Sequence, residues 1–288
     1  MADMRALIAL LRPHQWLKNG FVFVGLLFGH AWHDSDKLHM ALLAALAFCL
    51  VSSAVYVFND LADREADRLH PRKRQRPLAA GSVSVQAAVI LAVALLVGGG
   101  LAAWAASPMV LTIVSLYLIL NLAYSVRLKR VVILDVFVIA AGFMLRLLAG
   151  TLGLGIPPSS WLLLTGLMVT LFLGFTKRHA ELMGTDDAPA RAVLRMYSRP
   201  MLELMIGVCA SGVVVFYGLY TMSPETVAVH HTDRLVWTLP FVLYGLFRYL
   251  YFTFNTDAGE DPARDLLRDP HLLVTLLGWV ALTAWLLA

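Results

Sequence analysis

Residues 56–81 read YVFNDLADREADRLHPRKRQRPLAAG and directly follow a run of about 20 apolar residues. A run of that length, wound as a helix, crosses the roughly 30 Å hydrocarbon core of a bilayer. Residues 60–67 then hold Asp60, Asp63, Glu65 and Asp67, with cationic side chains among and after them. The sequence therefore predicts a transmembrane helix whose polar end carries a dense group of opposed charges.

The rest of the chain is equally apolar, because 59% of its 288 residues are hydrophobic, 15% are charged and the mean hydropathy is +0.73. This composition excludes an ordinary soluble domain. We predict an all-α integral membrane protein, with residues 1–288 forming a single domain of nine transmembrane helices. The predicted spans are Gln15–Trp32, Leu38–Phe58, Val83–Ala106, Pro108–Tyr124, Val131–Ile156, Ser159–Thr176, Pro200–Met222, Leu235–Phe254 and His271–Ala288.

Positive charge predicts the orientation of these spans, because Lys- and Arg-rich loops stay in the cytoplasm. Nine spans divide the loops into two sets. Of the 23 Lys and Arg residues, only Lys37 and Arg234 fall in the less basic set, and Arg146 lies inside a span. We therefore expect a multi-pass protein of the plasma (inner) membrane with a cytoplasmic N-terminus and an outer C-terminus. Topology accounts for the net charge of +4 without a nucleic-acid partner.

The acidic group follows the pattern N-D-x-x-D-x-x-x-D. On a helix continuing at about 100° per residue, Asn59, Asp60, Asp63 and Asp67 share one face. Their carboxylates repel one another unless a cation lies between them. Oxygen ligands without His or Cys suit Mg²⁺, which commonly bridges carboxylates to substrate phosphates. The pattern therefore favours a Mg²⁺ site over a solvated helix end whose acids pair with neighbouring arginines.

A cationic loop follows the acids. Prolines at both ends of a turn fix a loop rather than extend the helix. Cations beside metal-binding carboxylates are typical of a diphosphate site. The alternative is that these cations only keep the loop in the cytoplasm, but that role would not require acids on the neighbouring helix face. The loop's prolines are Pro71 and Pro77, and the cationic or titratable residues between or beside them are His70, Arg72, Lys73, Arg74 and Arg76.

A second polar group surrounds the start of the fifth predicted span. Tyr124 closes the fourth span, Lys129 lies in the turn, and Asp135 lies just inside the fifth. Arg146 follows about three helical turns later, on the same face and about 16 Å deeper. Ionisable groups inside a membrane are costly and mark a cavity or a partner. At that separation the two charges do not pair with each other, and we favour a functional cavity.

Two further segments carry candidate residues. The sixth span ends in GFTKRHAEL (174–182), where Lys177, Arg178 and Glu181 form either a helix-end salt bridge of small energy or a second phosphate and metal cluster. In RPHQWLKN (12–19), Lys18 and Asn19 either lie at the interface or reach a bound phosphate. Both alternatives stay open for both segments.

Taken together, these motifs resemble the UbiA superfamily of intramembrane prenyltransferases. The resemblance rests on N-D-x-x-D-x-x-x-D after the second span, Y-S-x-x-L-K followed by Asp at the fifth, and nine spans. It implies a helical bundle around a central cavity, in which acidic motifs on the second and sixth helices hold Mg²⁺ and a diphosphate.

The chain departs from that family at the second motif, which is usually D-x-x-x-D but here reads Lys177, Arg178 and Glu181. The exchange of acid for cation resembles the decaprenyl-phosphate phosphoribosyltransferase branch. R-P-x-Q-W-x-K-N (12–19), D-R-x-H-P-x-K-R-x-R-P (67–77), G-F-x-L-R (142–146) and K-R-x-A-E (177–181) also match that branch. A donor and an acceptor that both carry phosphate need more cations than a single diphosphate does.

The resemblance implies transfer of 5-phosphoribose from phosphoribosyl pyrophosphate to a polyprenyl phosphate, with release of pyrophosphate. Mg²⁺ on Asn59, Asp60, Asp63 and Asp67 would neutralise the leaving group, with Asp63 and Asp67 essential to activity. Either Asp135 or Glu181 would stabilise the positive ribose carbon. The expected substrate-binding residues are Lys18, Asn19, Lys73, Arg74, Arg76, Tyr124, Lys129, Arg146, Lys177 and Arg178.

Two other functions compete with this one. The first is a UbiA-type aromatic prenyltransferase that uses a polyprenyl diphosphate, and Lys177 in place of an acid argues against it. The second is a transporter or channel whose charges line an anion path. Transporters commonly show inverted repeats and broken helices in matching positions, whereas the charges here gather at one side of the membrane.

Overall fold

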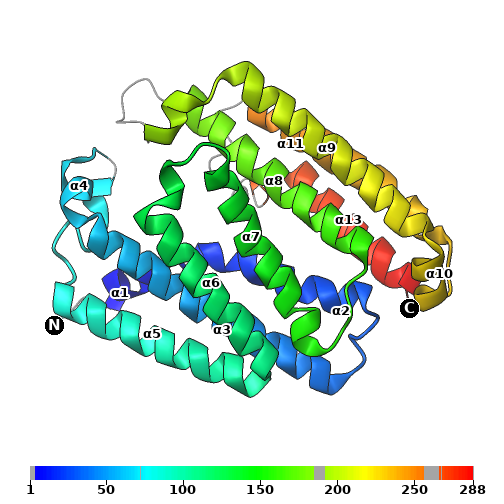
Figure 1. The fold of residues 1–288 in the computed structure, drawn as a ribbon, viewed down its shortest axis with the longest axis horizontal. Helices are drawn as coiled ribbons and strands as arrows, with labels where there is room; N and C mark the ends of the chain where they lie inside the picture. The colour runs from blue at the N-terminus through cyan, green and yellow to red at the C-terminus, as the bar shows by residue number, and fades with distance from the viewer. Residues whose placement is uncertain (1–3, 72, 185–191, 256–265, 267, 288) are drawn as a thin grey trace. The chain divides into compact units, whose positions relative to one another are not determined.

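The structure, a computed structural model, describes residues 4–71, 73–184, 192–255, 266 and 268–287. Every regular element in these ranges is a helix, as predicted. Eight helical segments of the described residues are long and apolar enough to cross a membrane. They are α3 (Ser35–Ala62), α5 (Val85–Ala106), α6 (Pro108–Val126), α7 with η4 (Leu134–Leu154), α8 (Ser160–Met183), α9 (Arg199–Met222), η6 with α11 (Arg234–Asn255) and α13 (Pro270–Leu287) (Figure 1).

The first predicted span, Gln15–Trp32, is not among these eight, so the count of nine is not confirmed. After α1 (Met4–Leu11), a 3₁₀ helix, η1 (Pro13–Phe23), leads into a short α-helix, α2 (Val24–Phe28). A 3₁₀ helix rises about 2.0 Å per residue and an α-helix about 1.5 Å. Together η1 and α2 are therefore roughly 30 Å long, a length comparable to the hydrocarbon core.

Polar caps explain where the long helices begin. The first backbone N–H groups of a helix have no partner within it, and a side-chain oxygen at the preceding residue can accept from them. Pro begins α6 and α10 (Pro224–His230), where its missing N–H costs nothing. The caps are Asp34, Ser84, Ser107, Ser159, Ser198 and Ser223, which start α3, α5, α6, α8, α9 and α10.

The described contacts group into two compact units, which are treated separately below. Unit 1 comprises Met1–Leu26, Ala31–Arg127 and Leu145–Ile156. In it α3 packs against α5 and α6 (Figure 1). Small residues permit the close approach, since a Cβ on Gly99 would lie 2.6 Å from Cγ2 of Val51.

A close backbone contact at Gly150 fixes the end of η1 and the start of α2 against the end of α7 (Leu134–Ala149) within unit 1. A Cβ on Gly25 would lie 1.8 Å from the carbonyl oxygen of Gly150, and a Cβ on Gly150 would lie 1.8 Å from that of Val22. Only glycine leaves room for backbones this close. The contact brings the 3₁₀ helix to the part of α7 that carries Arg146.

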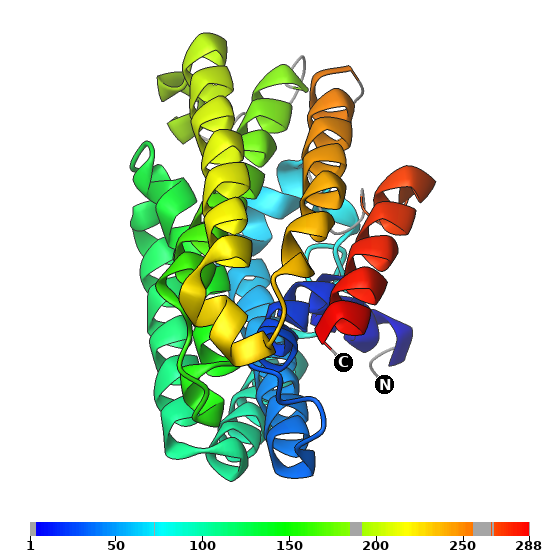
Figure 2. The same cartoon turned by 90° about the vertical axis from the view of Figure 1, so that its right-hand side faces the viewer.

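Unit 2 comprises Leu27–His30, Leu128–Met144 and Pro157–Ala288. In it α8 packs against α9, and α11 (Leu239–Asn255) packs against α13. Figure 2 shows how α9, in yellow, leads through α10 and η6 (Arg234–Thr238) into α11, in orange. A Cβ on Gly174 would lie 2.6 Å from Cγ1 of Val136, so the end of α8 lies tightly against the start of α7.

The remaining elements are short, and all but η4 lie near the predicted cytoplasmic ends of the spans. In unit 1, α4 (Arg64–Leu69) and η2 (Lys73–Gln75) follow α3, and η4 (Leu152–Leu154) follows α7. In unit 2, η3 (Leu128–Arg130) precedes α7 and η5 (Ala192–Met196) precedes α9. Of these, only η4 lies at the opposite, predicted outer end.

Candidate active site

Two of the predicted metal ligands come together in unit 1 around one guanidinium group. Nη1 of Arg76 lies 3.0 Å from Oδ1 of Asp60 and 2.7 Å from Oδ2 of Asp67. A second cation, Nη2 of Arg12, lies 2.6 Å from the same oxygen of Asp60. Both carboxylates are buried, and buried carboxylates require such charged partners. Asp60, near the end of α3, and Asp67, on α4, therefore converge on a shared cation.

The other two predicted ligands, Asn59 and Asp63, lie apart from this point. Oδ1 of Asn59 accepts a hydrogen bond of 2.6 Å from the hydroxyl of Ser125 on α6. Asp63 is exposed at the end of α3, with φ −92° and ψ 5°, so the helix is interrupted there rather than continuing to Asp67 as predicted. In the described part of the chain, no three His, Cys, Asp or Glu side chains form a group able to hold a metal ion.

The geometry of Asp60 and Asp67 nonetheless suits a divalent cation. Oδ1 of Asp60 and Oδ2 of Asp67 both lie against Nη1 of Arg76. A divalent cation would be attracted to the same position between the two carboxylates. Oxygen-only donors of this kind match Mg²⁺. The exposed carboxylate of Asp63 lies between them in sequence and leaves a further oxygen ligand accessible to solvent.

Hydrogen bonds fix the backbone of the cationic loop (residues 70–77), and long cationic side chains extend from it. The hydroxyl of Ser82 donates to the carbonyl of Pro77 at 3.0 Å, and the N–H of Arg76 donates to the carbonyl of Lys73 at 2.9 Å. Gly81 has φ +77°, which glycine adopts without strain. Lys73 and Arg74 are exposed on η2, while Arg72 lies outside the described residues. Arg76 is thus the loop cation that the structure places against the acids.

Arg146 and Asn19, two predicted substrate-binding residues, meet inside unit 1. Nε of Arg146 donates to Oδ1 of Asn19 at 2.7 Å, and Nη2 donates to the hydroxyl of Tyr117 at 3.0 Å. Its guanidinium carbon also lies 4.6 Å from the ring centre of Tyr117 and 5.3 Å from that of Phe48. Asn19 completes the group by donating to Sγ of Cys49. The charge at this depth is thus held by an amide, a phenol and two aromatic faces.

The second predicted cluster lies in unit 2 and is centred on Arg178. Its Nε lies 2.9 Å from Oδ2 of Asp135, at an angle outside hydrogen-bond geometry, and its Nη1 donates to Oε2 of Glu181. The arginine side chain is 0% exposed and that of Asp135 is 1% exposed, whereas Glu181 keeps 16%. The tight Gly174–Val136 contact lies one turn before Arg178 and next to Asp135, and it brings the pair together.

The other predicted residues are placed less specifically. Lys177 and Lys129 are half-buried in unit 2, and Lys18 and Tyr124 are half-buried in unit 1. The salt bridge that the spacing of Lys177, Arg178 and Glu181 allows is present for Arg178. The carboxylate of Asp135 joins the same arginine from another helix.

Sequence reasoning missed several partners in these groups. Tyr117, Ser125 and Tyr197 each supply a hydroxyl to a predicted site residue. Arg12 stood in a quoted motif but was assigned no role. No spacing rule could have found Tyr197, which is 62 residues from its partner Asp135. Ser125 directly follows Tyr124 in the Y-S-x-x-L-K motif, so that motif was the available signal.

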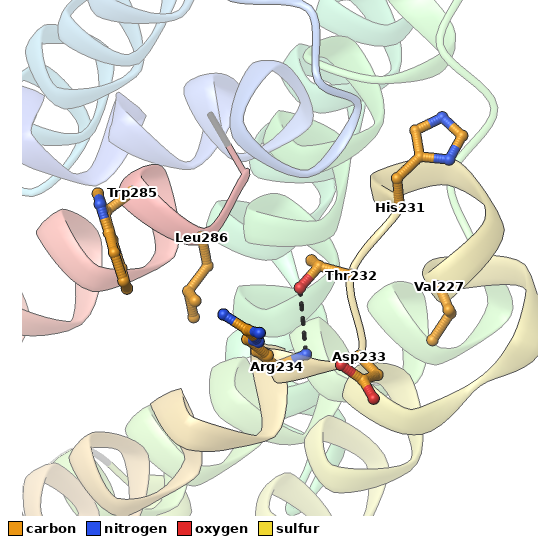
Figure 3. A pocket seen from close by; sticks show the side chains of 7 residues that line it. All are labelled: Val227, His231, Thr232, Asp233, Arg234, Trp285 and Leu286. Carbon is orange, nitrogen blue, oxygen red and sulfur yellow. Dashed lines mark hydrogen bonds between the residues drawn. The ribbon is translucent and has the colours of Figure 1, made fainter.

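A cavity of about 520 Å³ lies in unit 2 between the α10–η6 turn and the end of α13 (Figure 3). It contains none of the predicted site residues. By the predicted topology it opens on the outer side of the membrane. Its lining is Val227, His231, Thr232, Asp233, Arg234, Trp285 and Leu286.

Comparison with known proteins gives a consistent family. The UbiA prenyltransferase family model matches residues 20–268. The chain is 33% identical to the decaprenyl-phosphate phosphoribosyltransferase of Mycolicibacterium smegmatis, over 95% of this chain and 90% of that protein. It is 38% identical to nodulation protein NoeC of Azorhizobium caulinodans, over 93% and 88% of the two chains.

Among solved structures, a UbiA homologue from Archaeoglobus fulgidus, bound to GPP and Mg²⁺, matches with a TM-score of 0.76. The match covers 98% of this chain and 99% of that one at 19% identity, and at that identity it speaks for the fold alone. The all-α fold and the multi-pass membrane character predicted from the sequence agree with these matches. The chain belongs to the UbiA prenyltransferase family.

Proposed function

We propose that the protein transfers 5-phosphoribose from phosphoribosyl pyrophosphate to a polyprenyl phosphate, giving polyprenylphosphoryl-5-phosphoribose and pyrophosphate. The observation that carries the proposal is the similarity, over 95% of the chain, to a relative named decaprenyl-phosphate phosphoribosyltransferase. The cation-rich sequence at the end of α8, where the family usually has two acids, supports the same substrate class.

The reaction forms one bond and breaks one bond at ribose C1. The bond from C1 to the pyrophosphate oxygen breaks, and its electron pair leaves with pyrophosphate. A phosphate oxygen of the lipid supplies the new electron pair. This nucleophile is already anionic, so no strong general base is needed, and catalysis rests on positioning and electrostatics.

A metal ion would be held by Asp60 and Asp67, and Asp63 and Asn59, which lie apart from their shared nitrogen, would complete its ligands. When bound, Mg²⁺ would supply positive charge to the leaving diphosphate. In support, Asp60 and Asp67 already share one cationic group, Nη1 of Arg76. Arg76, Lys73 and Arg74 would bind phosphate oxygens, because guanidinium and ammonium groups form charge-assisted hydrogen bonds with them.

A nearby carboxylate would stabilise the positive charge that develops on ribose C1, and we assign that role to Glu181. Asp135 is enclosed and held by Arg178, whereas Glu181 has a partly exposed side chain. Lys177, on the same turn, would bind a donor phosphate. Arg178 would then orient Glu181 rather than contact substrate itself.

Membranes incubated with labelled phosphoribosyl pyrophosphate, a polyprenyl phosphate and Mg²⁺ test this function. The expected result is a labelled lipid that acid hydrolyses back to water-soluble label. A parallel incubation with a polyprenyl diphosphate and a hydroxybenzoate tests the aromatic prenyltransferase alternative. Prenylated benzoate without labelled lipid would overturn the proposal.

A further inference from the structure

The hydroxyl of Tyr197 lies at the centre of a buried contact in unit 2. It donates to Oδ1 of Asp135 at 2.7 Å and accepts the backbone N–H of Ile133, also at 2.7 Å. Tyr197 stands between η5 and α9, so it reaches the start of α7 from a separate part of the chain. Burial, together with the hydrogen bond to Asp135, raises the pKa of Tyr197, and the phenol therefore stays a proton donor.

The backbone that Tyr197 holds is strained. Ile133 has φ +69°, in the left-handed region that a β-branched residue enters only at a cost. Its carbonyl accepts the N–H groups of Val136 and Phe137, at 3.0 Å and 3.1 Å, and so begins α7. Such conformations persist only where surrounding contacts enforce them. The phenol is one such contact, and it acts two residues before Asp135.

From Asp135 the contacts continue to Glu181. One carboxylate oxygen of Asp135 takes the phenol, and the other lies against Nε of Arg178. The opposite end of the same guanidinium binds Glu181. Since Arg178 is fully enclosed, its planar group has no freedom to turn once Asp135 is fixed.

We infer that Tyr197 is a positioning residue that fixes the carboxylate of Glu181 through Asp135 and Arg178. The inference deepens the proposed function, because it rests on Glu181 facing the ribose centre. The phenol orients Asp135, Asp135 orients the guanidinium, and the guanidinium orients Glu181. Of the two carboxylates in this chain of four residues, Glu181 is the more exposed.

The first test is Tyr197→Phe, which keeps the ring and removes only the hydroxyl. We expect kcat to fall at least tenfold, with the KM values for donor and lipid changed less than threefold. Tyr217→Phe is the matched control, because its buried hydroxyl also makes two hydrogen bonds, to Thr238 and Trp279. The control should keep kcat within twofold, and an unchanged kcat in Tyr197→Phe would refute the inference.

A double-mutant cycle tests the route through Glu181. If Tyr197 acts through Glu181, then Tyr197→Phe should lower kcat less than twofold in a Glu181→Gln background. Losses that multiply would show that the tyrosine acts independently. Adding Ile133→Gly to Tyr197→Phe relieves the backbone strain at residue 133. It does not restore the hydrogen bond to Asp135. Full recovery of kcat in that double variant would reduce Tyr197 to a backbone support and overturn the inference.

A second readout needs no substrate. Thermal midpoints of the detergent-solubilised Tyr197→Phe, Asp135→Ala and double variants should be non-additive, because each single change already removes the hydrogen bond between these two residues. If wild-type membranes form no phosphoribosyl lipid, the proposed function fails while this coupling can still be present. If the changes in midpoint are additive, Tyr197 does not orient Asp135, and the inference fails whatever reaction the enzyme catalyses.

Discussion

An Arg178→Met variant tests whether Arg178 stabilises the fold as a buried ion-pair partner or binds substrate. The side chain is fully enclosed and is the cation that Asp135 and Glu181 share. Methionine fills similar space but leaves Asp135 buried without its cation. Removing one partner of a buried ion pair typically costs about 3–5 kcal/mol. At 2 °C or slightly more per kcal/mol for a chain of this size, the thermal midpoint should fall by about 6–10 °C.

The assay is thermal unfolding of the detergent-solubilised protein without substrate. Asp135→Asn combined with Arg178→Met removes the stranded charge and should recover at least half of the loss. Arg199→Met is the control, since Arg199 forms an exposed pair with Glu203 one turn away and should change the midpoint little. An unchanged midpoint in Arg178→Met, together with a raised KM for phosphoribosyl pyrophosphate, would refute this reasoning and make Arg178 a substrate ligand.

Four further predictions follow from the two units. EDTA should abolish activity and Mg²⁺ should restore it, while Asp67→Ala should remove most activity at saturating Mg²⁺; full turnover in EDTA would contradict the metal assignment. Lys177→Ala should raise the KM for phosphoribosyl pyrophosphate more than that for the lipid, measured by initial rates. Gly150→Ala should lower the thermal midpoint, because its Cβ would overlap the carbonyl of Val22, whereas Gly207→Ala, with open space around it, should not. Arg146→Lys keeps the charge but loses the planar fork, so it should stay folded by size-exclusion chromatography and lose most activity.

The sequence predicted the long helices well because their signals are local. Apolar runs of membrane length follow capping residues such as Ser107 and Ser159. In the structure, these residues lie directly before the first residue of a helix. The first span was different: a short apolar run does not distinguish a period of 3.0 from 3.6, so η1 was expected as an α-helix. The interruption at Asp63 was missed for a related reason, since the acidic pattern alone reads as a continuous helix.

For the candidate site, the sequence identified charged residues but not their partners. It named Asp135 and Arg178 separately, because nothing in the spacing tells which two helices lie together. The small residue that permits their contact, Gly174, is unremarkable in a membrane helix. The sequence also left the choice between Asp135 and Glu181 open, and the difference in burial between the two carboxylates supplies a physical reason to prefer Glu181.

The 3₁₀ winding of η1 sets a register between two helices of different pitch. Residues three apart are eclipsed in a 3₁₀ helix, which aligns Trp16, Asn19 and Val22. Trp16 binds Ser53 and Asn19 binds Cys49, four residues apart on α3. Three 3₁₀ residues and four α residues both advance about 6 Å, so each turn of η1 meets one turn of α3. Rewound as an α-helix, η1 would fall short by about 1.5 Å per contact and turn Asn19 about 60° away from Arg146.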